Sequence, residues 1–336
     1  MITLHTSTKI HMMSKDNVPA AYAKSGDTVC FETLDCFGCQ IQQESQLLGK
    51  LDWSNINPAT GPLFIEDALP GDVLKVEILK IELDDHGVMC DGPGNGVTGC
   101  AVTRESTKIL PVADGMVHFN DKLSFPINPM IGVIGTAPVG DGMDTGTPGA
   151  HGGNMDCTRI GIGATLYLPV NVPGALLAMG DLHARMGDGE VEVCGVEIAG
   201  AVTVQVTVVK NCGLPTPFLV NSEIAAAIHS AETLDDAAVG ATMAMHGFLM
   251  RELGMNEHEA GMLLSVAGDL RICQIVDPEK TCRMELPVSI MEAYQYSFQE
   301  SASPSGKIGQ ASSFNSNYRE MDNGSFYLLF LSPILK

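Results

Sequence analysis

The stretch VTVQVTV at Val202–Val208 decides the fold class, because apolar and polar residues alternate in it without a break. Successive side chains of a β-strand point to opposite faces, so the four valines share one face and the polar residues share the other. The stretch therefore predicts a half-buried strand. Upstream segments alternate in the same way at Val29–Leu34 and Leu74–Leu83.

The second of these segments changes phase. Its apolar positions move by one residue between Ile78 and Leu79, which predicts a β-bulge. Turns rich in Gly, Pro and Asp separate the predicted strands, at Pro70-Gly71-Asp72, Gly92–Gly96 and Gly140-Asp141-Gly142. The protein is thus expected to be mainly β, with a β-sandwich-like catalytic body over residues 1–210.

The pattern becomes helical after Pro217. A helix is predicted over Asp235–Leu253 with Gly254 as its C-cap, and a second begins at Asn256 with a capping-box-like start. A strand at Leu270–Ile275 follows, so residues 211–296 are predicted to form a small C-terminal β-α-α-β (α+β) subdomain. Residues 297–336 read as an atypical, poorly ordered tail that is rich in Ser, Gly and Asn.

Composition limits the partners. The chain has 336 residues, with Lys+Arg 19 against Asp+Glu 40, and a formal net charge of −21. This charge argues against nucleic-acid and anionic-membrane partners. The ten cysteines are scattered and no apolar run approaches membrane-spanning length, so we expect reduced thiols and a cytoplasmic protein. A large β body with an α+β appendage is expected to form a homodimer.

The segment Gly149–Gly200 concentrates potential metal ligands in two motifs, GAHGGNMD and GDLHARMGDGE. Asp and Gly make turns in most β proteins, but a turn needs neither the His nor the Glu of these motifs. Carboxylates around an imidazole suit a divalent cation that activates water. The hard oxygen or imidazole donors of the segment are Asn154, Asp156, Asp181, His183, Asp188 and Glu190.

Strand geometry suggests how some of these donors meet. Asp181 and His183 are two residues apart, so a strand places both side chains on one face. After a turn at Met186–Gly189, Glu190 and Glu192 are expected to share a face of the returning strand. Such a hairpin would bring Glu190 close to His183.

The chain resembles the acetamidase/formamidase family over roughly residues 1 to 295. The resemblance rests on long ordered blocks: ETLDCFGCQI (Glu32–Ile41), LDWSNINPATGP (Leu51–Pro62), PGDVLKVEILKIE (Pro70–Glu82), FPINPMIGVIGTAP (Phe125–Pro138), TGTPGAHGGNMD (Thr145–Asp156), YLPV and GALLAMGDLHARMGDGE (within Tyr167–Glu190) and DLRICQIVDP (Asp269–Pro278). It implies a two-layered β-sandwich-like body with a C-terminal α+β subdomain. It also implies hydrolysis of short aliphatic amides, such as acetamide and formamide, to carboxylate and ammonia. The implied cofactor is a divalent metal, zinc first and calcium as the second choice.

Amide hydrolysis requires a nucleophile at neutral pH and a proton for the leaving nitrogen. We expect His183, Asp181 and Asp156 to be metal ligands, with Asp35 or Glu32 reaching in from the earlier strand. Glu190 is the expected general base, returning its proton to the departing ammonia. Asn154 is expected to hold the carbonyl or the carboxamide of a small neutral amide substrate.

Three further residues are expected to support the site or bind substrate. His151 precedes two glycines and is either a ligand or a loop residue, Asp188 either supports the site or fixes its turn, and Asp269 either reaches the site or serves a helix–strand connection. Two other functions remain open. One is an amidase that uses Cys36 or Cys157 as nucleophile, and the other is a non-catalytic calcium-binding β-sandwich module.

Overall fold

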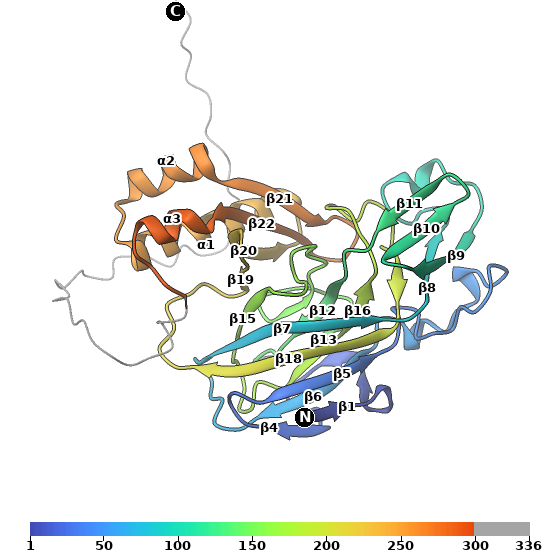
Figure 1. Ribbon diagram of the computed structural model, residues 1–336, viewed down its shortest axis with the longest axis horizontal. Helices are drawn as coiled ribbons and strands as arrows, with labels where there is room; N and C mark the ends of the chain where they lie inside the picture. Colours follow the sequence, from blue (N-terminus) through green and yellow to red (C-terminus); the bar gives the residue numbers. More distant parts are fainter. Residues whose placement is uncertain (299–336) are drawn as a thin grey trace, which may run out of the picture. The chain divides into compact units, whose positions relative to one another are not determined.

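Two large β-sheets organise residues 1–298, the part of the chain that the computed structural model describes (Figure 1). The protein is therefore mainly β, as predicted. The tail predicted at 297–336 lies outside the described residues except for its first two positions.

Sheet A contains nine strands among the described residues, and β18 near its centre carries the alternating valines. Nearly all neighbours in it are antiparallel, and the β1–β5 pair is parallel. In spatial order its strands are β1 (Ile2–Leu4), β5 (Thr28–Thr33), β18 (Gly200–Val209), β7 (Val73–Leu83), β15 (Thr165–Pro169), β19 (Phe218–Val220), β20 (Ile224–Ala231), β22 (Lys280–Pro287) and β21 (Asp269–Gln274).

Sheet B has eleven strands in the same part of the chain, and a short β3 (Met12–Met13) and β13 (Met143–Asp144) ribbon accompanies it. Its main path is β11 (Leu123–Pro126), β10 (Met116–Asn120), β9 (Ser106–Ala113), β8 (His86–Asp91), β17 (Glu197–Ile198), β16 (Leu177–His183), β12 (Met130–Gly135) and β14 (Gly152–Asn154). Beside β16 lies β6 (Ala59–Ile65), which also pairs with β2 (Lys9–Ile10) and β4 (Ala21–Ala23).

The predicted bulge lies in β7. Between Thr203 and Val204 of β18, the partner position in β7 advances by two residues and skips Leu79 in the ladder. Ile78 and Ile81 are buried on either side, whereas Leu79 is 49% exposed. The change of phase in the sequence is therefore a confirmed bulge, and the apolar face resumes at Ile81.

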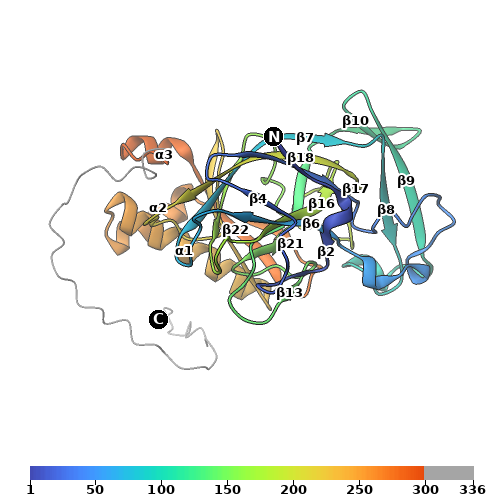
Figure 2. The same cartoon turned by 90° about the horizontal axis from the view of Figure 1, so that it is seen from below.

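Sheet A separates two apolar cores. In β20, Ala226 and Ile228 belong to the core between the sheets, whereas Ala225 and Ala227 belong to a second core beneath the helices. The helices therefore form a third layer on the outer face of one end of sheet A (Figures 1 and 2). They are α1 (Leu234–Leu253), α2 (Glu257–Ala267) and α3 (Val288–Ala293).

The helix boundaries follow the predicted capping residues. Gly254 ends α1 with φ 69°, in the left-handed region that favours glycine. Asn256 caps α2 by accepting the backbone N–H of Glu259 at 3.0 Å, and its side-chain amide donates to the Glu259 carboxylate at 2.9 Å. The predicted cap at Asn256 is thus confirmed, and Glu259 binds back to the side chain of Asn256, a variant of the capping box.

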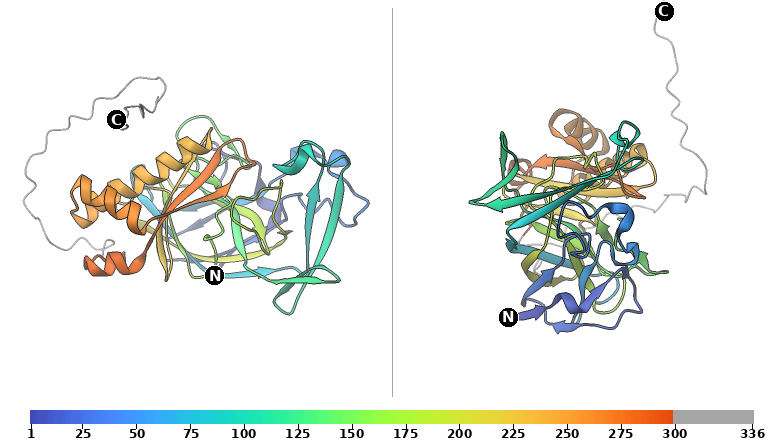
Figure 3. Two further views of the ribbon diagram at one scale, coloured as in Figure 1. Left: turned by 90° about the horizontal axis from the view of Figure 1, so that it is seen from above. Right: turned by 90° about the vertical axis from the view of Figure 1, so that its right-hand side faces the viewer.

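The segment 211–296 shares sheet A with the body. Its first strand, β19, pairs with β15 of the body, and β20, β22 and β21 continue the sheet beyond β19, so sheet A crosses the predicted boundary at residue 210. Strand β22 and helix α3 follow the predicted β-α-α-β unit. At the other end of the sheets, β8 to β11 form an arm away from the helices (Figures 1 and 3).

Within the described residues, every helix is too short or too polar to cross a lipid bilayer.

Candidate active site

His183, the last residue of β16, is fully buried among carboxylates. The ladder between β16 and β17 places His183 opposite Glu197, and its Nε2 lies 3.1 Å from Glu197 Oε1. The same nitrogen is 3.5 Å from Asp181 Oδ1 and 3.7 Å from Asp156 Oδ1. These four side chains and Glu190 are here called the acidic cluster.

Ligand atoms in and beside this cluster form two sets. Asp156, His183 and Glu190 each offer one such atom within 4.8 Å of the others. The second set is Cys36, Asp181 and Glu197, whose ligand atoms also lie within 4.8 Å of one another. Both sets mix hard oxygen donors with a softer nitrogen or sulfur donor, and zinc accepts such mixtures.

Many polar atoms of the cluster are buried without a hydrogen-bond partner among the described residues. They are both carboxylate oxygens of Asp156, Oδ1 of Asp181, both ring nitrogens of His183, and Oε2 of Glu190 and of Glu197. Buried polar atoms are almost always paired, and each exception in a folded protein calls for an explanation such as a bound ion. The donor set therefore fits a cation.

The backbone is strained at three acidic residues of the cluster. Asp156, Asp181 and Glu190 have φ of 44°, 55° and 39°, in the left-handed region that side chains larger than glycine rarely adopt. Such conformations cost about 1–3 kcal/mol each and persist where the surroundings enforce them, often at functional sites. These backbone conformations accompany the convergence of three carboxylates in the acidic cluster.

Gly132 of β12 forms the floor of the cluster. A Cβ atom at this position would overlap Oδ2 of Asp181 and Oδ1 of Asp156. The two carboxylates therefore approach the backbone of β12 directly, and glycine is needed here for space.

Burial and mutual repulsion perturb the titration of these groups. Burial and then the charge of Asp181 raise the pKa of Asp156, and burial and then Asp156 raise the pKa of Glu190. Burial raises the pKa of Glu197 to about 7. Burial disfavours a charged imidazole, but the charges of Glu197 and Asp181 outweigh it and raise the pKa of His183. Carboxylates this close ionise together only beside positive charge.

Asn154 at the end of β14 is held by an acidic residue of the β21–β22 connection. Its Nδ2 donates to Asp277 Oδ2 at 2.9 Å, whereas its Oδ1 is buried without a partner among the described residues. The free oxygen of Asn154 is therefore an acceptor available to an N–H group.

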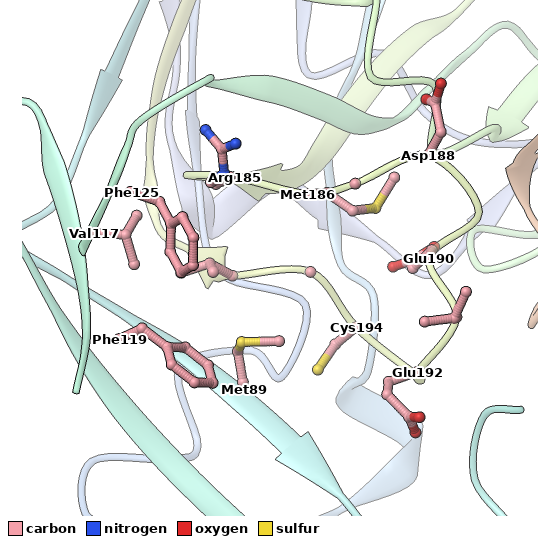
Figure 4. Close-up of a pocket in the computed structure, with 14 residues that line it drawn as sticks. Met89, Val117, Phe119, Phe125, Arg185, Met186, Asp188, Glu190, Glu192 and Cys194 are labelled. Atoms are coloured by element: carbon pink, nitrogen blue, oxygen red, sulfur yellow. The ribbon is translucent and has the colours of Figure 1, made fainter. Parts of the chain in front are cut away.

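A cavity of about 320 Å³ lies between the arm and the loop that carries Glu190 (Figure 4). In Figure 4, Phe119 and Phe125 of the arm face Glu190 and Cys194 across this space. A second cavity, of about 310 Å³, lies on the side of the acidic cluster. Its polar lining includes Asn154, Asp181, Glu190, Glu197 and Asp277, here called the polar wall. The second cavity gives a small molecule access to the cluster.

Residues 5–145 and 139–293 match the sequence profile of the Acetamidase/Formamidase family. The chain belongs to this family. An acetamidase of Bacillus halodurans has 50% identity and a TM-score of 0.86, over 87% of this chain and 99% of its own. A predicted acetamidase/formamidase of Thermoanaerobacter tengcongensis has 47% identity and the same TM-score, over 88% and 99%.

The curated relatives are more distant. The formamidase of Methylophilus methylotrophus is 26% identical over 60% of this chain and 65% of its own length. The chain thus spans less than two thirds of that relative. The two solved structures, in contrast, are each matched over 99% of their own length.

The structure brings together most of the predicted ligands. Asp156, Asp181 and His183 lie in the cluster with the predicted base, Glu190. Glu32 lies elsewhere: its carboxylate is half-exposed and pairs with His5 at 2.8 Å.

The turn after β5 contributes Cys36, the neighbour of Asp35, to a ligand set. Asp35 accepts the backbone N–H of Phe37, two residues on, which is the Asx-type turn that the sequence allowed, and its Oδ1 also accepts the backbone N–H of Cys39 at 2.7 Å. Burial raises the pKa of Asp35, and Asp35 is outside both ligand sets. Its neighbour Cys36 supplies the thiol.

The three supporting residues have different surroundings. His151 is 2% exposed, with neither ring nitrogen paired to a described residue. Asp188 binds the buried Arg283 through both oxygens, at 2.9 and 2.6 Å, and accepts the Thr158 hydroxyl at 2.6 Å. Asp269 is exposed and pairs with Arg271 at 3.2 Å, away from the cluster.

The predicted hairpin has a different return strand. The partner of His183 is Glu197 of β17, whereas Glu190 and Glu192 lie in the irregular connection before it. Glu190 reaches His183 from this connection. Sequence reasoning missed Glu197 and Asp277 and considered Cys36 only as a possible nucleophile; the block DLRICQIVDP contained Asp277 and the block ETLDCFGCQI contained Cys36.

Proposed function

We propose that this protein hydrolyses short linear amides, with formamide and acetamide as its simplest substrates, to a carboxylate and ammonia. The observation that carries the proposal is the set of buried carboxylate oxygens around His183, beside a cavity, that have no hydrogen-bond partner among residues 1–298. Membership of the acetamidase/formamidase family supports the same reaction class.

The donor set supports a divalent cation held by His183, Asp156 and Asp181, with Glu197 and Cys36 at its edge. An imidazole and a thiol among the donors favour zinc over calcium, which prefers six to eight oxygen ligands. A bound zinc ion lowers the pKa of water toward neutrality and polarises a carbonyl.

Two side chains are suited to handle the substrate and the proton. The free Oδ1 of Asn154 accepts an N–H of the substrate carboxamide, because its Nδ2 is already committed to Asp277. Oε2 of Glu190 has no partner among the described residues and lines the cavity. Glu190 takes a proton from the attacking water and returns it to the amide nitrogen, so that ammonia leaves as the C–N bond breaks.

The geometry gives less support to a cysteine nucleophile. Cys157 has a pKa lowered to about 7, first by its hydrogen bond with Cys273, but it is fully buried in the core between the sheets. Cys36 faces the cavity, but burial raises the pKa of its thiol well above the usual value. A nucleophilic thiolate requires access together with a low pKa.

The test is ammonia release from formamide, acetamide and propionamide, measured together with the metal content of the protein. We expect chelation to abolish ammonia release and zinc to restore it, with thiol alkylation less effective than chelation. Full activity in protein stripped of metal would overturn the metal-dependent mechanism. No ammonia from zinc-loaded protein would leave the calcium-binding module as the better interpretation.

The variant His183→Ala tests the assigned ligand directly. It is expected to lower zinc occupancy and ammonia release together. His258→Ala is the matched control, because His258 is an exposed surface residue at the start of α2. A His183→Ala protein that retained full zinc and activity would remove His183 from the ligand set.

A further inference from the structure

The cavity beside the acidic cluster has two chemically different walls. The apolar side chains that line the same cavity, here called the apolar wall, are Phe37, Leu48, Trp53, Ile56 and Val193. Four of these five side chains come from the connection between β5 and β6, and the fifth precedes β17. A carboxamide on the polar wall therefore directs its acyl group toward apolar side chains.

The apolar wall is preformed. Phe37 and Leu48 are 4% and 3% exposed and belong to a small core of their own. The backbone N–H of Asn57 donates to the Cys36 carbonyl at 2.7 Å and closes the base of the connection. Asp52 accepts the backbone N–H of Ser54 at 3.0 Å and caps the short helix that carries Trp53. Binding an acyl group here thus requires little ordering of the protein.

The cavity is larger than acetamide requires. One water occupies about 30 Å³ of liquid, so about 310 Å³ corresponds to roughly ten heavy atoms. Acetamide has four heavy atoms and presents a single methyl group to the apolar wall. The remaining space is bordered by side chains that gain from contact with further methylene groups.

We infer that the substrates include amides with apolar acyl groups longer than acetyl, of roughly four to six carbons, seated between Trp53 and Ile56. The inference rests on the proposed amide hydrolysis at the acidic cluster and names the substrate class of that site. Trp53 lines the cavity and is 60% exposed, so contact with an acyl chain would remove part of its apolar surface from water.

The experiment compares kcat/KM for acetamide, butyramide and hexanamide by ammonia release. We expect an increase of roughly fourfold per methylene up to the length of the cavity, which corresponds to burial of each group. A kcat/KM that falls from acetamide onward, while acetamide is turned over, would overturn the inference and leave the proposed function intact.

Two variants locate the effect. Trp53→Ala and Ile56→Ala are expected to lower kcat/KM for hexanamide about tenfold and that for acetamide less than about twofold. Tyr22→Ala is the matched control for Trp53, because Tyr22 is an aromatic residue 59% exposed outside the cavity. Equal losses for all amides would show that the wall does not bind the acyl group.

Binding separates the inference from turnover. The affinities of Glu190→Gln for acetamide and hexanamide, measured by titration calorimetry, are expected to rise with chain length. If no amide is hydrolysed by the unaltered enzyme, length-dependent binding that Trp53→Ala abolishes would sustain the cavity assignment, and only the proposed function would fall. Binding that is independent of length would overturn the inference.

Discussion

At the scale of single residues, Glu190 has a buried carboxylate and a left-handed backbone conformation. Its Oε2 has no hydrogen-bond partner among the described residues. Its proposed role is proton transfer, so Glu190→Gln is expected to lower kcat by about 10²–10⁴ while zinc occupancy is retained. Zinc content by mass spectrometry and ammonia release check both parts. Loss of zinc together with activity would make Glu190 a ligand.

Glu192→Gln is the matched control for this variant. Glu192 lies in the same connection, but its carboxylate accepts the Thr98 hydroxyl and is outside both ligand sets. Glu192→Gln is expected to change kcat by less than about twofold, because Glu192 takes no part in the proton transfer assigned to Glu190.

His151 predicts a specific dependence of stability on pH. Burial lowers its pKa from 6.5 to about 4, so it is neutral in the folded protein and binds protons more readily in the unfolded chain. The stability that it contributes is complete above pH 6.5 and is lost as the pH falls toward 4, by about 3 kcal/mol in all.

Urea unfolding at pH 7.5 and pH 5 measures this effect. The free energy of unfolding should fall more steeply toward pH 5 in the unaltered protein than in His151→Leu, because the variant lacks the titrating group. His258→Leu, at an exposed site, is expected to retain the steep dependence. Parallel profiles for the unaltered protein and His151→Leu would contradict the assignment.

At the scale of elements, the connection 184–196 is fastened to sheet A through an ion pair. Cys282, Met284 and Leu286 of β22 face the helices, so the alternate residue Arg283 faces the other way, where it binds Asp188. Arg283 is 1% exposed, and Glu285 also accepts from it at 2.6 Å.

Asp188 and Asp269 form a matched pair for testing this connection. Asp188→Ala leaves a buried guanidinium short of a partner and is expected to lower the free energy of unfolding by about 3 kcal/mol. Asp269→Ala removes an exposed ion pair with Arg271 and is expected to cost less than about 1 kcal/mol. Urea unfolding measures both, and equal losses would contradict the structural difference.

The elements that sequence patterns predicted are those with local signals. The change of phase at Ile78 and Leu79 indicated the bulge, and the capping residues indicated the start of α2 and the end of α1. The pairing of His183 with Glu197 had no such signal, because an irregular connection of thirteen intervening residues separates them. Register across such a connection depends on the rest of the sheet.

At the scale of the whole molecule, the three-layered end of the structure provides a second core. Phe248 of α1 is fully buried there and packs against Phe218 in a tilted arrangement, with ring centroids 5.1 Å apart. Phe248→Ala is expected to lower the free energy of unfolding by about 3–5 kcal/mol, because truncation leaves a cavity. Val239→Ala on the exposed face of α1 should change it by less than about 0.5 kcal/mol.

Unfolding by urea checks this prediction, with ammonia release as a second measurement. The second core is on the opposite face of sheet A from the core between the sheets, so folded Phe248→Ala is expected to retain its kcat. A stability change no larger than that of Val239→Ala would contradict the assignment of Phe248 to a tightly packed core.

The sequence was sufficient to predict a β body, an α+β unit and a cluster around His183, because alternation, caps and donor motifs are local. It was insufficient to predict that body and subdomain share sheet A, because this depends on the pairing of β15 with β19. The site also uses the thiol of Cys36, which belongs to a ligand set, and Asp277, which holds Asn154; both lie far from the central motifs in the chain and meet them only in the folded protein.

The site is sensitive to an uncharged substitution at Gly132. Gly132→Ala adds one methyl group, with no charge and no donor, at the point where Asp156 and Asp181 converge. The methyl would displace both carboxylates, so we expect zinc occupancy to fall sharply although the substitution removes no titratable group. Hydrogen in place of a side chain at this position is thus as much a requirement of the chemistry as the acids themselves.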